Sequence, residues 1–310
     1  MTSVRVWFSP YTLLARASLN AKSISRAREG ALLRFEFAEG FGYADLHPWT
    51  ELGDAPLTEQ LKELATGHPT KLAQRSQALA HEDAKARAGG KSAFARSSFD
   101  NHYLVTDLDA LHEDLPASLG FSTLKIKVGR DLKRELQKLA QLTSYRLRLD
   151  FNGTATTSSF VTFVQALSPA LHEAIEFIED PTSFVREWKE LPLQEKFALD
   201  RPGDYGHENP APFTYRIFKP ATQHSQEVLG QKQKIVTTSY LDHPVGQMGA
   251  MLEASRLKEP GVCGLASHIA YEANAYSDLL VMKGSELLAP SEPGIGFTKL
   301  LEKENWKELR

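Results

Sequence analysis

The 310-residue sequence has little cysteine, no excess of basic charge and no long apolar run. Cys263 is its only cysteine, which excludes a disulfide within the chain and leads us to expect a reducing, cytoplasmic location. The 36 Lys and Arg residues are balanced by 39 Asp and Glu residues, which excludes the basic surplus of typical nucleic-acid binders. No segment approaches the ~20 apolar residues that a membrane-spanning helix needs. We therefore expect a small-molecule function without nucleic-acid or membrane partners, and a monomer is compatible with this composition.

The first hundred residues predict a small α+β domain. Apolar residues near the start resemble a signal-peptide core, but Ser9 and Pro10 interrupt them, so we expect a strand near residues 4–8. Segment 31–37 continues through the turn Glu39-Gly-Phe-Gly42 into another strand, which is a hairpin pattern. Helical patterns follow near 57–65 and 70–88, the second ending at Gly89-Gly90. We expect this domain to span residues 1–97, with a tail from about residue 289 to residue 310 packing back on it.

From residue 98 to residue 288, short apolar strands alternate with helical patterns. The eight expected strands are 103–106, 123–128, 146–150, 174–179, 196–200, 215–219, 235–239 and 262–266. Eight parallel strands joined by helices favour an α/β fold with a TIM-type (β/α)7β barrel. An open doubly wound sheet would alternate in the same way, but no Gly-x-Gly-x-x-Gly follows the early strands.

Charged residues lie at the ends of these strands. Lys125 and Lys127 share one face of strand 123–128, because side chains alternate along a strand. In a buried parallel strand two lysines need nearby carboxylates, and the next three strands end in carboxylates: Asp150, Glu179 and Asp200, with Lys219 on the strand after them. One such carboxylate alone is more often a turn residue, but strand ends of a barrel converge on its active site. An all-oxygen set suits Mg²⁺, with Mn²⁺ as a substitute.

The series Lys-x-Lys, Asp, Glu, Asp, Lys resembles the enolase superfamily in its muconate-lactonizing subgroup, and the local residues are most similar to its o-succinylbenzoate synthases. Segment 39–45 resembles the glycine-rich strand of the family's capping domain, and Thr237-Thr-Ser-Tyr240 resembles the serine segment that lies beside substrate. The resemblance implies these roles: metal ligands Asp150, Glu179 and Asp200; general acid/base Lys127, with Lys125 as its neighbour; Lys219 as the cation on the opposite face of the substrate; and Asn152, Ser239 and Arg148 beside the substrate. For Asn152 and Arg148, polar filling of the barrel is an equal alternative.

The resemblance implies a Mg²⁺-dependent removal of a proton α to a carboxylate. The substrate would be 2-succinyl-6-hydroxy-2,4-cyclohexadiene-1-carboxylate, which loses its hydroxyl as water to give 2-succinylbenzoate in menaquinone biosynthesis. Segments 13–20 and 46–49 would close over it. Two residues depart from the pattern: Arg201 follows Asp200, and Asp180 follows Glu179.

Two alternatives stay open. An N-succinylamino acid racemase or epimerase of the same superfamily would use Lys127 and Lys219 as paired acid/base groups. A dipeptide epimerase is disfavoured, because Leu265-Ala-Ser-His268 stands where such enzymes carry Asp-x-Asp. A catalytically silent metal-binding barrel is disfavoured by the three lysines, since buried like charges destabilise a fold that does not use them. Cys263 is expected to be a packed small residue.

Overall fold

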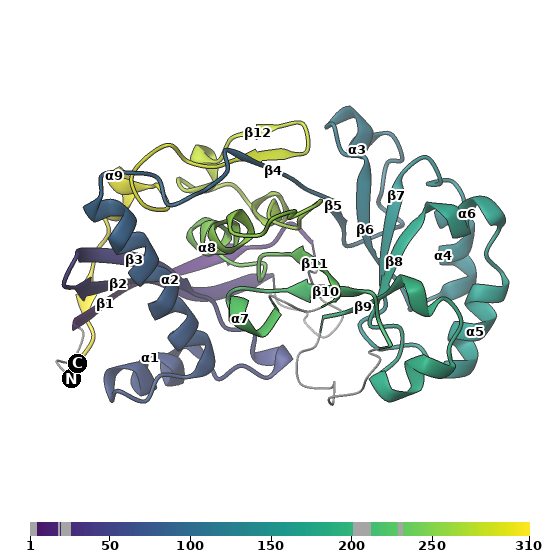
Figure 1. Ribbon diagram of the computed structural model, residues 1–310, viewed down its shortest axis with the longest axis horizontal. Coiled ribbons are helices and arrows are strands. Elements are labelled where there is room, and N and C mark those ends of the chain that lie inside the picture. Colours follow the sequence, from purple (N-terminus) through teal and green to yellow (C-terminus); the bar gives the residue numbers. More distant parts are fainter. Residues whose placement is uncertain (1–4, 18, 20–25, 201–211, 229–231) are drawn as a thin grey trace.

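The computed structural model describes residues 5–17, 19, 26–200, 212–228 and 232–310. Its elements form two groups: an antiparallel sheet with two helices lies at one end of the molecule, and a curled parallel sheet covered by short helices lies at the other (Figure 1). Helix α8 (Pro244–Ser255) lies beside the antiparallel sheet, although it follows the parallel strands in sequence. The chain therefore has an α/β fold with an additional antiparallel layer.

The antiparallel sheet has the order β14-β1-β2-β3, from strands Lys307–Glu308, Arg5–Leu14, Ala27–Phe37 and Gly40–Leu46. The predicted hairpin is confirmed: β2 and β3 pair from Phe37↔Gly40 to Ala31↔Leu46. Gly40 has a φ of 123°, which favours glycine at this turn. The pairing of Trp7 with Glu308 brings the last strand beside the first.

The two predicted N-terminal helices are confirmed as α1 (Leu57–Ala65) and α2 (Lys71–Ala88). The side chain of Thr70 caps α2 by accepting a hydrogen bond from the backbone N–H of Ala73, at 3.2 Å. Helix α2 packs closely on β3, because a Cβ atom on Gly42 would lie 1.9 Å from the carbonyl oxygen of Ala80. The buried face of this helix and the inner face of the sheet form one apolar core.

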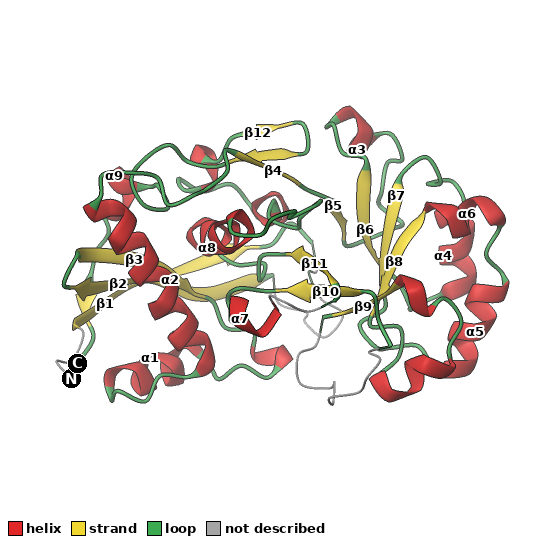
Figure 2. Cartoon of the chain, in the orientation of Figure 1, coloured by secondary structure: helices red, strands yellow, loops and turns green. Residues whose placement is uncertain are grey.

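The parallel sheet has the order β11-β10-β9-β8-β7-β6-β5. Its strands are β5 (Tyr103–Val105), β6 (Thr123–Lys127), β7 (Arg146–Asp150), β8 (Ile175–Glu179), β9 (Phe197–Leu199), β10 (Tyr215–Phe218) and β11 (Lys234–Thr237). The helices that connect these strands are α3 (Leu115–Ser118), α4 (Leu132–Leu139), α5 (Thr157–Gln165), α6 (Pro169–Ala174) and α7 (Ser225–Val228), with 3-10 turns at Val185–Glu190 and Gln194–Lys196 (Figure 2). Seven of the eight expected strands are thus confirmed within one or two residues.

The eighth expected strand, 262–266, is wrong as a regular strand. Within the described residues this segment forms only isolated bridges, Asn101↔Cys263 and Thr238↔Gly264. Gly264 lies so close to neighbouring side chains that a Cβ atom there would be 2.6 Å from the His102 ring. The segment nevertheless joins the end of β11 to the residues just before β5, since the N–H of Gly264 donates to Thr237 and the N–H of His102 donates to the carbonyl oxygen of Cys263.

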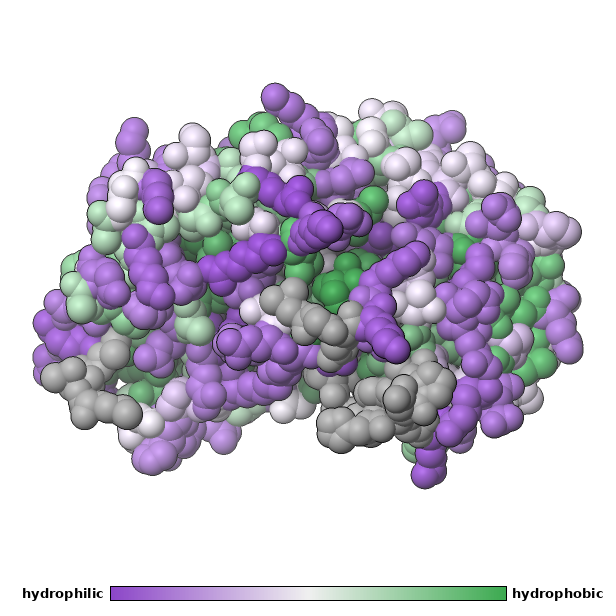
Figure 3. Space-filling view, in the orientation of Figure 1, coloured by the Kyte–Doolittle hydropathy of each residue, from purple (hydrophilic) through white to green (hydrophobic). Residues whose placement is uncertain are grey.

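The remaining chain adds a hairpin that the sequence pattern did not predict, β12 (Met282–Lys283) with β13 (Glu286–Leu288), which pairs with β4 (Ser98–Asp100). A short helix, α9 (Thr298–Leu301), and 3-10 turns at Thr50–Leu52, Ser267–Ala270 and Ser277–Leu279 complete the elements. Hydrophilic side chains cover most of the face in Figure 3. Among the helices of the described segments, none has the length and apolar character needed to cross a membrane.

Candidate active site

The lysines and carboxylates singled out in the sequence lie together along the C-terminal ends of β6 to β10. The strand register places Lys127 opposite Asp150 and Asp150 opposite Glu179. Asp200 follows β9 directly, and Lys219 follows β10. The three strands that bring the carboxylates therefore lie between the strands that bring Lys127 and Lys219, so a molecule bound at this edge would meet a lysine from each side.

Lys125 is the most deeply embedded of the three lysines. Its ammonium group donates to both carboxylate oxygens of Glu179, at 2.8 and 2.7 Å, and lies 3.2 Å from Oδ2 of Asp150. Burial opposes its charge, but the carboxylates of Asp150 and Glu179 outweigh burial and raise the pKa of Lys125. Lys125 therefore remains a fixed positive charge and cannot act as a base.

Asp150 and Glu179 are neighbours, but their pKa values are shifted in opposite directions. Burial raises the pKa of Asp150, but Lys125 and Lys127 outweigh it, so that its pKa falls to about 2. Burial, together with the negative charge of Asp150, raises the pKa of Glu179 to about 8. Lys125 alone does not offset burial and the charge of Asp150 at Glu179, so the site would gain from a further cation.

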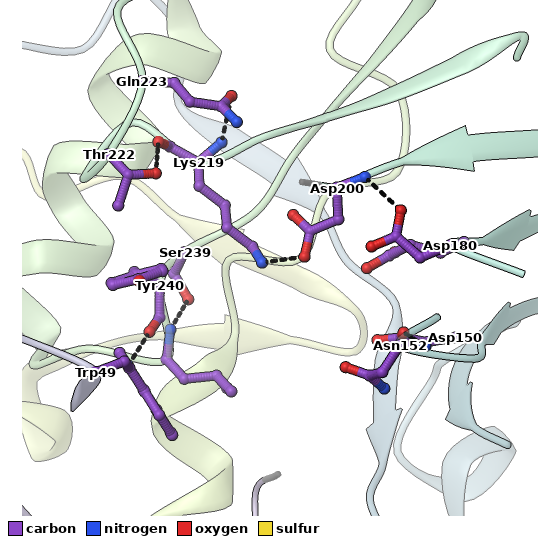
Figure 4. A network of polar contacts seen from close by, with 12 residues as sticks. Trp49, Asp150, Asn152, Asp180, Asp200, Lys219, Thr222, Gln223, Ser239 and Tyr240 are labelled. Atoms are coloured by element: carbon purple, nitrogen blue, oxygen red, sulfur yellow. Dashed lines mark hydrogen bonds and ion pairs between the residues drawn. The ribbon is translucent and has the colours of Figure 1, made fainter. Parts of the chain in front are cut away.

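Lys127 and Lys219 are the more accessible lysines, with side chains 15% and 19% exposed. The Lys127 ammonium lies 3.8 Å from Oδ2 of Asp150, too far for a good hydrogen bond. Lys219 forms an ion pair with Asp200, and Figure 4 shows its side chain extended toward that carboxylate. Both ammonium groups thus lie on the more exposed side of the three carboxylates.

Asp200 has one oxygen in use and one without a partner. Its Oδ2 accepts from Lys219, whereas its buried Oδ1 has no hydrogen-bond partner among the residues that the structure describes. The backbone N–H of Asp200 donates to Oδ1 of Asp180, at 3.2 Å (Figure 4). Asp180 has a φ of 44°, unusual for a residue other than glycine, so the turn after β8 is shaped to hold Asp200. The sequence pattern indicated Asp180 only as a departure from the family.

The donor set fits a divalent cation. Asp150, Glu179 and Asp200 offer carboxylate oxygens, the ligands that Mg²⁺ prefers, and the unpartnered oxygen of Asp200 is a ready acceptor. Within the ranges that the structure describes, however, no three Asp, Glu, His or Cys side chains are already arranged to hold a metal ion. The reason is visible in the contacts, because Lys125 and Lys219 form ion pairs with these same carboxylates.

A second segment of the chain reaches the site from the antiparallel sheet. The indole N–H of Trp49 donates to the carbonyl oxygen of Tyr240, at 2.8 Å, and the Tyr240 hydroxyl donates to Asp54. The Lys219 ammonium lies 6.0 Å from the centre of the Tyr240 ring (Figure 4). The expected closing segment 46–49 therefore contacts the loop beside Lys219. In the other expected closing segment, 13–20, residues 18 and 20 lie outside the described residues. Arg201, which follows Asp200, also lies outside them.

The three expected substrate residues differ in their surroundings. Asn152 is exposed beside Asp150, whereas Ser239 is buried and donates to the hydroxyl of Ser267, at 2.6 Å. The guanidinium of Arg148 is occupied, because it contacts Glu176 at 2.7 Å, His102 at 3.0 Å and the carbonyl oxygen of Val262 at 2.9 Å. These contacts support the barrel-filling alternative for Arg148. Cys263 is fully buried, and burial raises the pKa of its thiol to about 12, as expected for a packed residue.

Solved structures share this fold at low sequence identity. The chain aligns with a mandelate racemase/muconate lactonizing protein from Herpetosiphon aurantiacus at a TM-score of 0.76 and 12% identity, over 95% of this chain and 98% of that one. An L-Ala-D/L-Glu epimerase from Bacillus subtilis gives a TM-score of 0.75 at 16% identity, over 96% and 98%. At such identities the likeness establishes the fold: a curled parallel sheet with an N-terminal antiparallel sheet.

The comparisons of sequence identify the family, which the structural neighbours do not. Residues 6–86 match the family model described as O-succinylbenzoate synthase, N-terminal domain. An o-succinylbenzoate synthase from Bdellovibrio bacteriovorus is 36% identical over 99% of this chain and 99% of its own length. An o-succinylbenzoate synthase from Pectobacterium atrosepticum is 27% identical over 54% of this chain and 55% of its own. This chain belongs to the o-succinylbenzoate synthase family.

Proposed function

We propose that this chain is an o-succinylbenzoate synthase, a hydro-lyase that converts 2-succinyl-6-hydroxy-2,4-cyclohexadiene-1-carboxylate to 2-succinylbenzoate. The observation that carries the proposal is the full-length similarity to a synthase of that name. The geometry supports it, because two accessible lysines flank a group of three carboxylates. That arrangement suits the removal of a weakly acidic proton α to a carboxylate, where negative charge must be stabilised as it develops.

Asp150, Glu179 and Asp200 would hold a divalent metal ion, Mg²⁺ by preference and Mn²⁺ as a substitute. When bound, the ion supplies positive charge to the substrate carboxylate as the enediolate forms. A dipeptide epimerase from Methylococcus capsulatus, which shares the fold at a TM-score of 0.73, was solved with Mg and a dipeptide. Lys125, already held between Glu179 and Asp150, adds a second fixed positive charge on the same side.

Lys127 in its neutral form accepts the α-proton, and the electron pair of the broken C–H bond is delocalised onto the carboxylate. The same lysine then returns a proton to the hydroxyl, which leaves as water while the ring becomes aromatic. Lys219 remains protonated and stabilises the planar intermediate from the other side, with Tyr240 beside its ammonium group. Asn152 and Ser239 are assigned to substrate contact, and Trp49 keeps the Tyr240 loop in place.

Two structural assignments go with this proposal. Residues 1–97, with the tail from about 289 to 310, would form the capping domain, and residues 98–288 the catalytic barrel. The pairing of β14 with β1 supports the first assignment. The bridges of Gly264 to Thr238, directly after β11, and of Cys263 to Asn101, just before β5, support closure as a (β/α)7β barrel, with a short irregular eighth strand. A cytoplasmic location stays a prediction.

The decisive assay follows the diene absorbance of the substrate with purified protein, in the presence of Mg²⁺ or of EDTA. Loss of absorbance only with Mg²⁺ is the expected result. The main alternative, an N-succinylamino acid racemase, is favoured by the placement of Lys127 and Lys219 on opposite sides of the carboxylates. It predicts exchange of the α-proton of an N-succinyl amino acid in D2O. Proton exchange without dehydration would replace the assignment as a synthase with that of a racemase. No reaction in either assay would favour a metal-binding protein without catalytic activity.

A further inference from the structure

Two buried carboxylates lie close together where the antiparallel sheet meets helix α8. Asp45 belongs to β3, and Asp242 lies just before the first turn of α8. A Cβ atom on Gly246, in that first turn, would lie 2.6 Å from Oδ2 of Asp242 and 2.7 Å from Oδ2 of Asp45. Both carboxylates therefore face the same point. A side chain larger than that of glycine at position 246 would collide with them.

These carboxylates have few partners. Asp45 accepts from the Tyr11 hydroxyl at 2.6 Å and from the backbone N–H of His243 at 3.0 Å. Asp242 is 2% exposed, and within the described ranges its Oδ1 has no hydrogen-bond partner. In the described part of the chain, neither carboxylate forms an ion pair with a lysine or arginine. The adjoining hollow is lined mainly by apolar side chains, such as Leu79 and Val245, and offers no positive charge.

The surrounding ionisable groups do not supply a counter-charge either. They are Tyr11 on β1, Arg28 on β2, His47 after β3, His243 before α8, and Tyr271 and Tyr276 near the C-terminal segment. Arg28 is paired with Glu51, at 2.5 Å. Burial lowers the pKa values of His47 and His243 to about 3, so both rings are neutral. Burial raises the pKa of Asp242 to about 7, and burial with the charge of Asp242 raises that of Asp45.

We propose that Asp45 and Asp242 hold one proton between them at neutral pH, and that this acid pair joins segment 45–54 to segment 239–243. Two negative charges that face the same point in a buried site would repel without compensation, whereas a neutral acid can donate a hydrogen bond to the remaining carboxylate. The pair is thus a pH-sensitive connection between two loops.

The connection reaches the active site, and this part of the inference rests on the proposed function. Segment 239–243 contains Ser239 and Tyr240, and segment 45–54 contains Trp49 and Asp54, which bond to Tyr240. Asp45 and Asp242 are therefore positioning residues, which hold Tyr240 near Lys219 without touching the substrate. Their loss should raise KM more than it lowers kcat.

The first test compares the melting temperature of wild type and Asp242→Asn at pH 6 and pH 9. Because the folded state holds a proton that the unfolded state loses near pH 4, wild-type stability falls as the pH rises through about 7. Asparagine cannot ionise, so the variant should gain several degrees relative to wild type at pH 9 but not at pH 6. His47 and His243 lower stability below about pH 6.5, but both proteins carry them, so their effect cancels in the difference between wild type and Asp242→Asn.

The control is Asp278→Asn, the same change at an exposed carboxylate. An Asp242→Asn difference that is equal at both pH values would overturn the proposal. So would a melting temperature at pH 9 that depends on whether the salt is sodium or potassium chloride, because a bound cation would then replace the proton.

A second measurement covers the case in which Asp242→Asn does not fold. The infrared spectrum of Mg²⁺-loaded wild type at pH 6 should contain a carbonyl band of a protonated carboxylic acid, which disappears at pH 9. Absence of the band in wild type would mean that both groups are ionised and would refute the proposal. Neither measurement uses the reaction, so failure of the assigned activity and failure of the acid pair are distinguishable. A raised KM with kcat nearly unchanged in Asp242→Asn supports the positioning role, and an unchanged KM refutes it.

Discussion

Lys125 donates from one ammonium group to both oxygens of Glu179, at 2.8 and 2.7 Å. The same group lies 3.2 Å from Asp150, so a single ammonium group of the chain already contacts two of the three carboxylates. A metal ion bound to Glu179 and Asp150 has to share them with this ammonium. Metal affinity and stability of the metal-free protein are therefore coupled through Lys125.

Replacing Lys125 with methionine, which keeps most of the side-chain volume, should tighten Mg²⁺ binding and reduce turnover. The carboxylates lose a competing positive charge, while the substrate loses one of its stabilising charges. Isothermal titration calorimetry measures the first effect and the dehydration assay the second. Lys133→Met, on the exposed face of α4, is the matched control. Weaker Mg²⁺ binding in Lys125→Met would contradict this view of the site.

Lys127→Ala should lower kcat by at least about 100-fold, because a general acid/base group contributes that much or more. The fold and Mg²⁺ binding should persist, since Lys127 makes only a distant ionic contact, 3.8 Å from Asp150. Circular dichroism and the Mg²⁺-induced shift in melting temperature check both conditions. Lys133→Ala should retain full activity. Substantial turnover by Lys127→Ala would assign the base to another group.

Mg²⁺ should raise the melting temperature more at pH 9 than at pH 6. Without metal, folded Glu179 with its pKa of about 8 holds a proton that the unfolded chain releases near pH 4.5, so stability falls as the pH rises through 8. Mg²⁺ competes with this proton at low pH and replaces it at high pH. In Glu179→Gln the pH dependence of the shift should vanish. An undiminished shift in an Asp150→Ala, Asp200→Ala double variant would mean that the metal binds elsewhere.

Asp83→Ala should destabilise the fold by about 3 to 5 kcal/mol, because it removes one partner of a buried ionic network. Asp83 is fully buried on α2 and accepts from the backbone N–H groups of Tyr43, at 2.9 Å, and Ile295, at 2.7 Å. It also pairs with Arg87, at 2.7 Å. Urea unfolding measures the loss, and Asp278→Ala should stay within about 0.5 kcal/mol of wild type. An equal effect of the two substitutions would exclude this network as a source of stability.

The sequence predicted those parts of the fold that depend on local pattern. Alternating apolar runs located β5 to β11, and strand alternation put Lys125 and Lys127 on one face. The irregular segment 262–266 was missed, because its conformation depends on close packing of Gly264 against His102, which is 162 residues away in sequence. The hairpin β12–β13 was missed because strands of two and three residues have no detectable period.

The candidate site was predictable as a set of charges but not as a set of contacts. Strand ends indicated which carboxylates and lysines gather, since their position in the sheet follows from order along the chain. The ion pairs of Lys125 and Lys219, the bond from Trp49 to Tyr240 and the support of Asp200 by Asp180 depend on side-chain geometry between distant segments. No spacing in the sequence encodes them.

The pairing of β14 with β1 has a consequence for synthesis on the ribosome. Trp7 and Phe8 pair with Glu308 and Lys307, so one edge of the first sheet to emerge stays open until about 300 further residues have been translated. Open sheet edges recruit other strands, and pairing over so long a sequence separation is slow. Nascent chains are therefore most exposed to misassembly before the last strand arrives, and chaperones that bind extended segments would protect them during that interval.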